Sequence, residues 1–504
     1  MPGNLQSVLI VGRDVDAWLT ALSLVRAFGR SGPKISILEL PSVIGSSDVF
    51  SALPTLAGLH RLIGLNENDI LRAGKGVSVL GQRYSNWSVS GEPFLHAYDS
   101  HGMGRDGEEF FQFWLRAKSE GLSVSLEDFS FGAAAAKNGK LLTPGSSIPA
   151  FSQAASGYNF DMGPYIAVLA KLAVDQGVEV VSGDFEAPVW DRGCISGIRL
   201  SDGTSVHADL YVDASGLGAQ LISQIPDAKF SSWRDWLPCN MQMSMTAPRL
   251  SPMPAFTEVQ AFKGGWVTMH PLRERTAIVA GFNSDITPVE DVARLIPMLT
   301  GAGVSGDGFV SPIVTGLRTP WIGNCVAIGA AAAGLEPLDA APSHLLHVGI
   351  STLISLFPSR PSAMPEAAVY NRIMADHAEN LRDFQAAHYQ MNTRFDEPFW
   401  DFARAAEPPA ALQSRMDLFR SRGRVLTREN ETLQQHNWIS ILNGHGLEPS
   451  SFGPGVYKVS QPGLMQFFKQ ILHEIAAGVR SLPALEAHME MEAPMKPANL
   501  PGSF

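Results

Sequence analysis

The first forty residues constrain the fold more than any other segment. Residues 7–11 are an apolar run of strand length, residues 18–28 carry apolar side chains at helical spacing, and residues 35–39 form a second strand-like run. Gly32 and Pro33 end the helical pattern before that run. This order predicts a βαβ unit. Because both strands are apolar, we expect them in a buried parallel sheet.

The turn after the first strand departs from the pattern that binds dinucleotides. In such units the turn reads G-x-G-x-x-G, and an acidic residue at the end of the second strand accepts hydrogen bonds from the ribose hydroxyls. Here the six positions are Gly12-Arg13-Asp14-Val15-Asp16-Ala17, and Glu39 ends the second strand. Asp14 and Asp16 put negative charge where a pyrophosphate would lie, and like charges ~4 Å apart repel by several kcal/mol in a partly buried site. Two interpretations stay open: a turn that binds no nucleotide, and a nucleotide site in which Arg13 compensates for the acids.

The remaining pattern predicts a mixed α/β chain with a helical C-terminal part. Short apolar runs at 178–181, 195–200, 210–213 and 325–328 are typical of further strands. Alternating, aromatic-containing strands over about 226–309 predict an inserted antiparallel sheet. From about residue 342 the sequence pattern predicts amphipathic helices, most clearly over 365–394. An exposed apolar face on that helix could support a homodimer. We expect an α/β domain at 1–349 and a helical module at 350–504.

Composition excludes several classes of protein. The 504 residues are too many for one core, and 45% hydrophobic with 17% charged residues is globular. A net charge of −11 without a basic stripe argues against nucleic-acid binding. Cys194, Cys239 and Cys325 are too dispersed for a disulfide framework or a metal cluster. No signal peptide or membrane span is visible, so a cytoplasmic location is expected.

A series of short motifs along the whole chain is more specific. The chain contains Tyr158-Asn159-Phe160-Asp161-Met162, Asp213-Ala214-Ser215-Gly216-Leu217, Gly323-Asn324-Cys325-Val326-Ala327-Ile328-Gly329, Glu336-Pro337-Leu338-Asp339, His344-Leu345, Tyr370-Asn371-Arg372, Arg382-Asp383-Phe384, His388-Tyr389, Arg394, Asp396 and Pro398-Phe399-Trp400. In order and spacing these motifs resemble those of the flavin-dependent tryptophan halogenase family.

The resemblance implies a fold, a cofactor and a chemistry. The fold would be a flavin-monooxygenase-type, glutathione-reductase-like FAD-binding box with an antiparallel substrate sheet and a mostly helical C-terminal module. Reduced FAD, supplied by a flavin reductase, would form a hydroperoxide that oxidises halide. Hypohalous acid would then reach a lysine and a glutamate beside an aromatic substrate. Residues implied to bind FAD are Gly12, Glu39, Asp213, Gly216, Gly329 and Leu338.

The two catalytic positions of that family are altered in this chain. The position of the lysine is Val79, which can neither hydrogen-bond hypohalous acid nor form a haloamine. Lys75, four residues upstream, is interpreted as a surface lysine. The position of the glutamate is Asp339, which keeps the charge on a shorter side chain. Pro342 follows, and because proline has no N–H, halide binding near this loop is doubtful.

Other positions around the implied flavin differ as well. The loop after the second strand carries Asp48-Val49-Phe50, and Phe50 is large enough to occupy space that a flavin would need. His270 is interpreted as a satisfied polar residue rather than a catalytic one. Aromatic candidates for a substrate cavity, for which ordinary core packing is an equal alternative, are His96, Tyr98, Phe399, Trp400 and Trp438.

Two functions follow from this pattern. The favoured hypothesis is a family member that no longer halogenates and keeps the scaffold to bind an aromatic ligand or a partner. The alternative is a working FAD-dependent halogenase or monooxygenase that acts on an indole-like aromatic substrate through altered flavin contacts. No metal site is expected for either.

Overall fold

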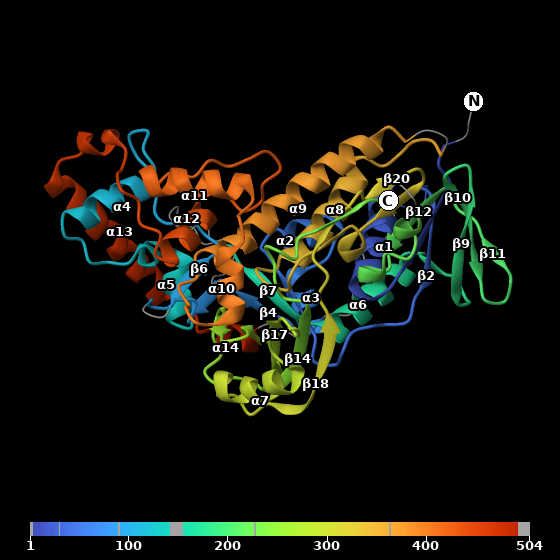
Figure 1. Cartoon of the computed structure of the whole chain (residues 1–504), viewed down its shortest axis with the longest axis horizontal. Coiled ribbons are helices and arrows are strands. Elements are labelled where there is room, and N and C mark those ends of the chain that lie inside the picture. The colour runs from blue at the N-terminus through green and yellow to red at the C-terminus, as the bar shows by residue number, and fades with distance from the viewer. Residues whose placement is uncertain are drawn as a thin grey trace.

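The computed structural model describes residues 4–29, 31–88, 91–141, 155–225, 228–361 and 364–491. The molecule is elongated (Figure 1). Helices α4 (Phe110–Ser119), α11 (Ala410–Arg422), α12 (Gln435–Gly444) and α13 (Gln461–Ser481) gather at one end, and strands β9 (Phe185–Asp191), β10 (Cys194–Leu200) and β11 (Ser205–Val206) lie at the other. The prediction of a mixed α/β chain with a helical C-terminal region is confirmed.

A six-stranded sheet contains the predicted βαβ unit. Its order is β20 (Trp321–Ile322), β21 (Cys325–Ala327), β12 (Leu210–Ala214), β1 (Ser7–Gly12), β2 (Lys34–Glu39) and β8 (Glu179–Val180). All neighbours pair in parallel except β20 with β21. Helix α1 (Asp14–Phe28) connects β1 to β2, and residues 15 and 17–24 of the helix are buried. The predicted strand at 178–181 is reduced to β8, a two-residue edge strand whose side chains are exposed.

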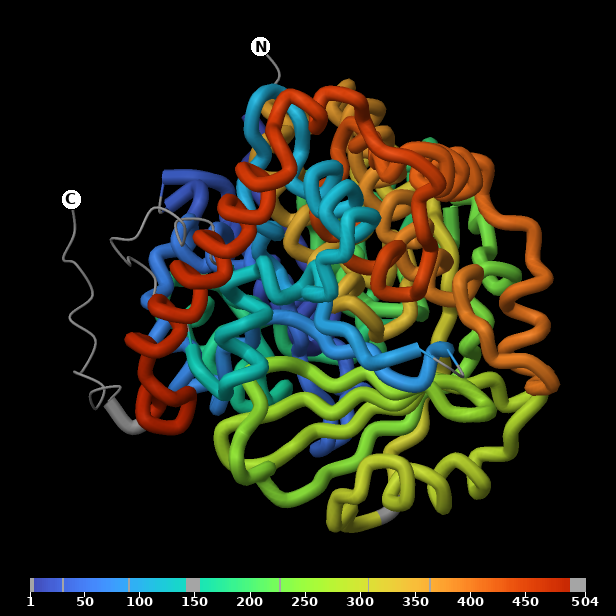
Figure 2. The backbone as a smooth tube through the Cα atoms, turned by 90° about the vertical axis from the view of Figure 1, so that its left-hand side faces the viewer, coloured from blue at the N-terminus to red at the C-terminus, as the bar shows by residue number. Residues whose placement is uncertain are grey.

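The predicted antiparallel sheet is present as a seven-stranded sheet. Its order is β18 (Ser305–Pro312), β14 (Met241–Pro248), β17 (Arg275–Phe282), β16 (Gly265–Pro271), β15 (Thr257–Phe262), β5 (Gly81–Ser85) and β6 (Phe94–Ala97). The sheet therefore also contains β5 and β6, which precede the expected range of 226–309. Residues 226 and 227 of that range are not among the described residues. Only the β15–β5 pair is parallel. In Figure 2 the green strands of this sheet lie beneath the orange and red C-terminal helices, and its β5 and β6 are blue.

Three smaller sheets and the remaining helices complete the described part of the chain. The sheets are β11 (Ser205–Val206), β10 (Cys194–Leu200) and β9 (Phe185–Asp191); β13 (Phe230–Ser232), β19 (Gly316–Arg318) and β22 (Ala333–Gly334); and β3 (Val49–Ala52), β7 (Gly157–Asp161) and β4 (Val77–Val79). The helices are α2 (Leu56–Leu62), α3 (Glu67–Ala73), α4 (Phe110–Ser119), α5 (Phe131–Lys137), α6 (Met162–Asp175), α7 (Val289–Thr300), α8 (Ala341–Ser355), α9 (Glu366–Gln390), α10 (Pro398–Ala405), α11 (Ala410–Arg422), α12 (Gln435–Gly444), α13 (Gln461–Ser481) and α14 (Leu485–Met491).

Helix α9 packs beside α8 and extends along the upper side of the molecule in Figure 1, between its two ends. It is the predicted helix at 365–394, and it ends at Gln390. Its residues 380–389 are all buried within the chain, so the second half of the helix presents no exposed apolar face, whereas Val369 in the first half is 41% exposed. The homodimer that this face was to support stays a prediction.

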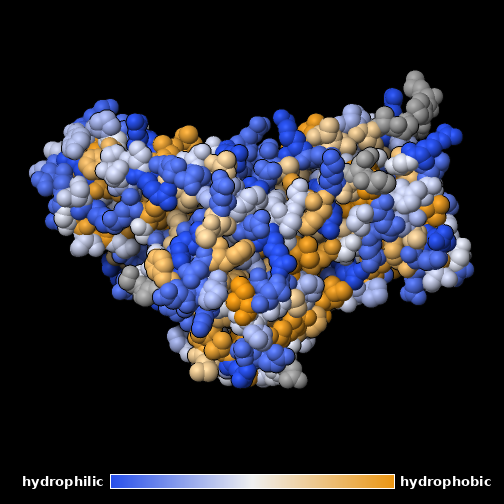
Figure 3. All heavy atoms as spheres, in the orientation of Figure 1, coloured by the Kyte–Doolittle hydropathy of each residue, from blue (hydrophilic) through white to orange (hydrophobic). Residues whose placement is uncertain are grey.

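One buried apolar cluster includes residues from both predicted domains, 1–349 and 350–504. It extends from Val8 and Ile10 in β1 to Trp438 in α12. The division at residues 349 and 350 stays a prediction, and both predicted domains include residues that the structure does not describe. None of the described helices is long and apolar enough to cross a membrane. The face in Figure 3 mixes hydrophilic and hydrophobic side chains.

Candidate functional site

A cavity of about 600 Å³ opens where the two large sheets meet the start of α8. Along the sequence its lining begins at the turn after β1, with Arg13 and Asp16, and ends at Leu346 in α8. Strands β3, β14, β16 and β17 line it in between. Its volume is that of an ordinary small-molecule site. Phe50 is part of this lining, and its ring stacks on Tyr165 of α6, 5.2 Å between centroids. That it occupies space a flavin would need stays a prediction.

The turn after β1 has the backbone of a dinucleotide-binding turn. A β-carbon on Gly12 would lie 2.5 Å from the carbonyl oxygen of Ala214, so only glycine lets β1 and β12 approach this closely. Asp14 adopts φ 53°, the left-handed region where glycine is favoured. Its carboxylate accepts hydrogen bonds from the Ser42 hydroxyl (2.6 Å) and the Val43 amide (3.2 Å). The aspartate therefore keeps the turn and fastens the loop after β2 to it.

Asp16 lines the cavity and contacts the turn at Gly329 and Ala330. Its Oδ2 accepts a hydrogen bond from the Ala330 amide at 3.3 Å. A β-carbon on Gly329, which has φ 62°, would lie 2.3 Å from the same oxygen. Burial raises the pKa of Asp16 to about 7, and the nearby Asp14 adds to the rise. A carboxyl group of this chain thus occupies the turn at Gly329 and Ala330.

Two of the residues implied to hold a cofactor are used by the protein itself. Glu39, at the end of β2, accepts a 2.8 Å hydrogen bond from the Trp18 indole. Asp213, fully buried at the end of β12, accepts hydrogen bonds from the amides of Ser215, Leu221 and Ile222 and from the Ser215 hydroxyl. Burial raises the pKa of Asp213 despite those bonds.

The six residues implied to bind FAD thus fall into two groups. Gly216 and Leu338 line the cavity. Gly12, Glu39, Asp213 and Gly329 are not part of the lining, although Gly329 contacts Asp16, which is.

Asp339 is held in a buried hydrogen-bonded chain. Tyr84 in β5 donates its hydroxyl to Asp339 Oδ1, and His388 Nε2 lies 3.4 Å from Oδ2. His388 Nδ1 in turn lies 2.8 Å from His445 Nε2. Burial alone would raise the pKa of Asp339, but His388 and the Tyr84 hydroxyl outweigh it and hold this pKa below its usual value. From the sequence, His388 was named only as part of a family motif, and no role was given to Tyr84 or His445.

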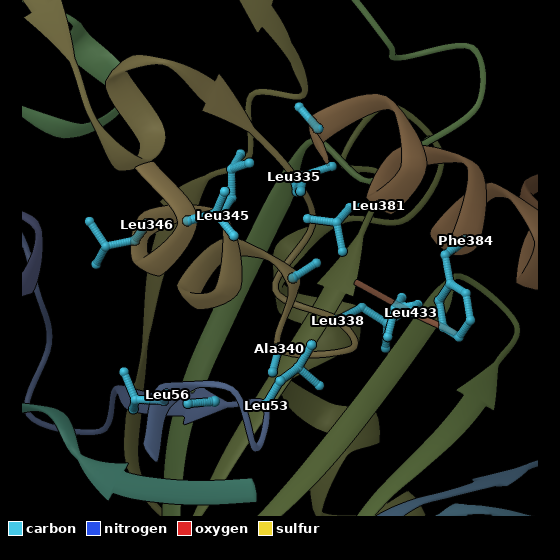
Figure 4. Packing of buried hydrophobic residues seen from close by; sticks show 14 of the residues in the cluster. Leu53, Leu56, Leu335, Leu338, Ala340, Leu345, Leu346, Leu381, Phe384 and Leu433 are labelled. Carbon is cyan, nitrogen blue, oxygen red and sulfur yellow. The ribbon is translucent and has the colours of Figure 1, made fainter. Parts of the chain in front are cut away.

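Asp339 and Ala340 turn the chain into α8. Both have positive φ, 59° and 55°. Two consecutive left-handed residues other than glycine are costly, about 1–2 kcal/mol each, so surrounding packing must hold them. Figure 4 shows that packing: Leu53 and Leu56 on one side, and Leu381 and Leu433 on the other, with Ala340 between.

Val79 does not face the cavity. It is fully buried in β4, pairs with Gly157 of β7, and belongs to the apolar core. No lysine is among the described residues that line the cavity. Lys75 lies at the surface, where it forms a 2.6 Å ion pair with Glu274, as predicted.

His270 and Asp48 line the cavity on the side of the large antiparallel sheet. His270 hydrogen-bonds Thr268 Oγ1 (2.8 Å) and Asn159 Oδ1 (3.3 Å), and burial lowers its pKa to about 3, so it is a satisfied neutral residue as interpreted. Asp48 accepts a 2.9 Å hydrogen bond from the Gly45 amide, and burial raises its pKa.

The five aromatic candidates for a substrate cavity are all buried, and none lines the described cavity. His96 hydrogen-bonds Asn437 at 2.9 Å, Trp400 donates to the Phe262 carbonyl, and Trp438 donates to Glu431. Their burial agrees with core packing, the alternative to a substrate cavity that the sequence left open. Over the described ranges, no group of three or more His, Cys, Asp or Glu side chains could hold a metal ion.

The fold is that of flavin-dependent halogenases. The structure is similar to that of a flavin-dependent halogenase from Brevundimonas sp. BAL3, with TM-score 0.91 and 29% identity over 97% of this chain and 99% of the other. A flavin-dependent halogenase from Xanthomonas campestris gives TM-score 0.92 and 26% identity over 98% and 99%.

Sequence comparison agrees. The tryptophan halogenase family model matches residues 7–461, and the chain belongs to this family. Tryptophan 6-halogenase SttH of Streptomyces toxytricini is 25% identical over 487 residues, 89% of this chain and 91% of the relative. The family uses FAD and a flavin reductase and acts on aromatic substrates.

The cavity fits only part of FAD. Its apolar middle could take a flat ring, whereas the turn that would hold the pyrophosphate carries Asp14 and Asp16. Because Asp16 already accepts from the Ala330 amide, a phosphate there would meet a carboxyl group instead of free donors. The residues present do not fit the pyrophosphate of FAD.

Proposed function

We propose that this protein is a member of the halogenase family that does not halogenate and that uses the retained cavity to bind an aromatic ligand. The observation that carries the proposal is Val79. A buried valine in β4 replaces the amine that the family's chemistry requires, and no lysine lines the described cavity wall in its place.

Asp339 is bonded to its own chain at one oxygen only. Tyr84 donates its hydroxyl to Oδ1, whereas Oδ2 has no hydrogen-bond partner among the described residues and faces His388 Nε2 at 3.4 Å. The proposal therefore rests on Val79 and not on Asp339.

A second candidate function is a working FAD-dependent halogenase or monooxygenase that acts on an indole-like substrate, with a flavin reductase as its partner. The glycine-like φ of Asp14 and the open cavity favour it, because the path for a dinucleotide is still present in the backbone. The carboxyl group of Asp16 in that path counts against it.

A product assay tests the proposal. The protein is incubated with tryptophan or indole, bromide or chloride, FAD, NADH, oxygen and a flavin reductase, and products are analysed by mass spectrometry. The tryptophan 6-halogenase of Streptomyces toxytricini serves as the positive control with tryptophan. We expect no monohalogenated product from this chain, and a product above the enzyme-free background would contradict the proposal.

A further inference from the structure

The cavity lining carries three carboxyl groups, those of Asp16, Asp48 and Asp339. Against them the lining has one guanidinium, that of Arg13, which donates to the Pro41 carbonyl at 2.9 Å. Burial raises the pKa of Asp16 to about 7 and also raises the pKa of Asp48, so both groups take up a proton more readily than exposed carboxyls. An anionic ligand would push them further toward the protonated state and would find one cation in the lining.

Some of these acceptors have no partner among the described residues. Gln220 Oε1, beside Gly216 in the lining, makes no hydrogen bond there. The same holds for Asp48 Oδ1, although the Ser244 hydroxyl is near enough to lower the pKa of Asp48. Buried polar atoms without a partner are rare, and they indicate a missing donor from water or a ligand.

Much of the remaining lining is apolar. Val49 and Phe50 of β3 and Val279 of β17 contribute to it, together with Ile313 and Leu335. An apolar wall with a few polar groups is typical of a site for a flat ring with polar substituents.

From these three features we propose that the cavity takes a flat aromatic ligand that is neutral or cationic, carries hydrogen-bond donors and has no phosphate. Asp16 supplies at the Gly329–Ala330 turn the acceptor that a phosphate would bring. The inference deepens the proposed function, since it rests on the same cavity and defines the ligand class.

Riboflavin and FAD test this class directly, because both carry the same three-ring system and only FAD carries a pyrophosphate. Each is titrated against the full chain, with binding followed by flavin fluorescence. We expect riboflavin to bind at least about tenfold more tightly than FAD, a difference of about 1.4 kcal/mol. Equal affinities, tighter binding of FAD, or no saturation by riboflavin at several hundred micromolar would each overturn the inference.

Variants separate the phosphate end from the ring. In the double variant Asp14→Gly with Asp16→Ala, FAD affinity should rise at least about tenfold while riboflavin affinity changes less than about threefold. Asp16→Asn, which keeps the shape of the side chain, should show the same direction if the double variant does not fold. An unchanged FAD affinity in a folded Asp16 variant would overturn the inference.

Asp291→Ala is the matched control. Asp291 is an acid in the first turn of α7, paired at the surface with Arg294, and it lies outside the cavity lining. Its removal should leave both affinities unchanged. The halogenation assay remains separate, because product formation would contradict the proposed function whatever the order of flavin affinities.

Discussion

The carboxyl group of Asp16 lies against Gly329 so closely that a β-carbon on that glycine would come within 2.3 Å of Oδ2. The two residues are 313 positions apart, and they join the turn after β1 to the turn after β21. In a dinucleotide-binding protein the pyrophosphate lies at the helix N-terminus after the first strand. In this chain the carboxyl group of Asp16, in the first turn of α1, contacts Gly329 and Ala330 there.

Gly329→Ala should destabilise the protein by about 2 kcal/mol, through the positive φ and the collision with Asp16. In an Asp16→Ala background the collision is gone, and the cost should fall to about 1 kcal/mol for φ alone. Urea unfolding of the four proteins in this double-mutant cycle gives the coupling. An equal loss of unfolding free energy for Gly329→Ala in both backgrounds would show that there is no steric coupling between Asp16 and residue 329.

Stability should depend on pH through Asp16. Its pKa is about 7 in the folded protein, against 3.8 for the exposed group. Between these values the folded state keeps a proton that the unfolded chain loses, so stability falls as pH rises from about 4 to 7 and levels off above 7. Asp16→Asn removes this group, and the stability advantage of wild type over the variant should shrink by up to about 1.4 kcal/mol per pH unit across that range.

Unfolding curves at pH 5, 6 and 7, each measured for both proteins, check the pH prediction. Because Glu336 also has its pKa raised to about 7 by burial, the difference between wild type and variant is the informative quantity. A difference that does not change with pH would contradict a buried, protonated Asp16.

Tyr84→Phe should destabilise the protein by about 2 kcal/mol, because it leaves the buried Asp339 carboxylate without its hydroxyl donor. The matched control is Tyr158→Phe, whose hydroxyl donates at 2.9 Å to the more exposed Glu67. That change should cost less, about 1 kcal/mol. Thermal or urea unfolding compares the two, and a larger loss for Tyr158→Phe would contradict the importance of the Tyr84–Asp339 bond.

Val79→Lys should not create a halogenase. It places an ammonium in the apolar core and should cost about 3 kcal/mol or more. Val79→Met is the neutral control of similar length and should cost less. A soluble, folded Val79→Lys protein that brominates tryptophan would show that the lysine was the only missing element.

Much of the architecture could be predicted from sequence because the signals are local. The apolar runs that became β1 and β2 and the spacing along α1 and α9 need no distant partner. The strand at 178–181 was overestimated, since β8 is an edge strand that the sheet supports on one side only.

The candidate site was less predictable. Val79 and Asp339 were found through the family resemblance, but the partners of Asp339 come from β5 and α9, which nothing local connects to it. Asp14 and Asp16 correctly indicated an altered turn, yet the sequence could not show that the cavity beside them stays open. That depends on where Phe50 points, and its ring packs on Tyr165 of a helix more than a hundred residues away.

The most direct test is a visible-absorbance titration of the purified wild-type protein with FAD. If Asp16 occupies the phosphate position, the flavin band should show no saturable change up to several hundred micromolar FAD. Saturable binding with a dissociation constant near about 1 μM, worth about 8 kcal/mol, would contradict this account. It would favour a working flavoprotein instead.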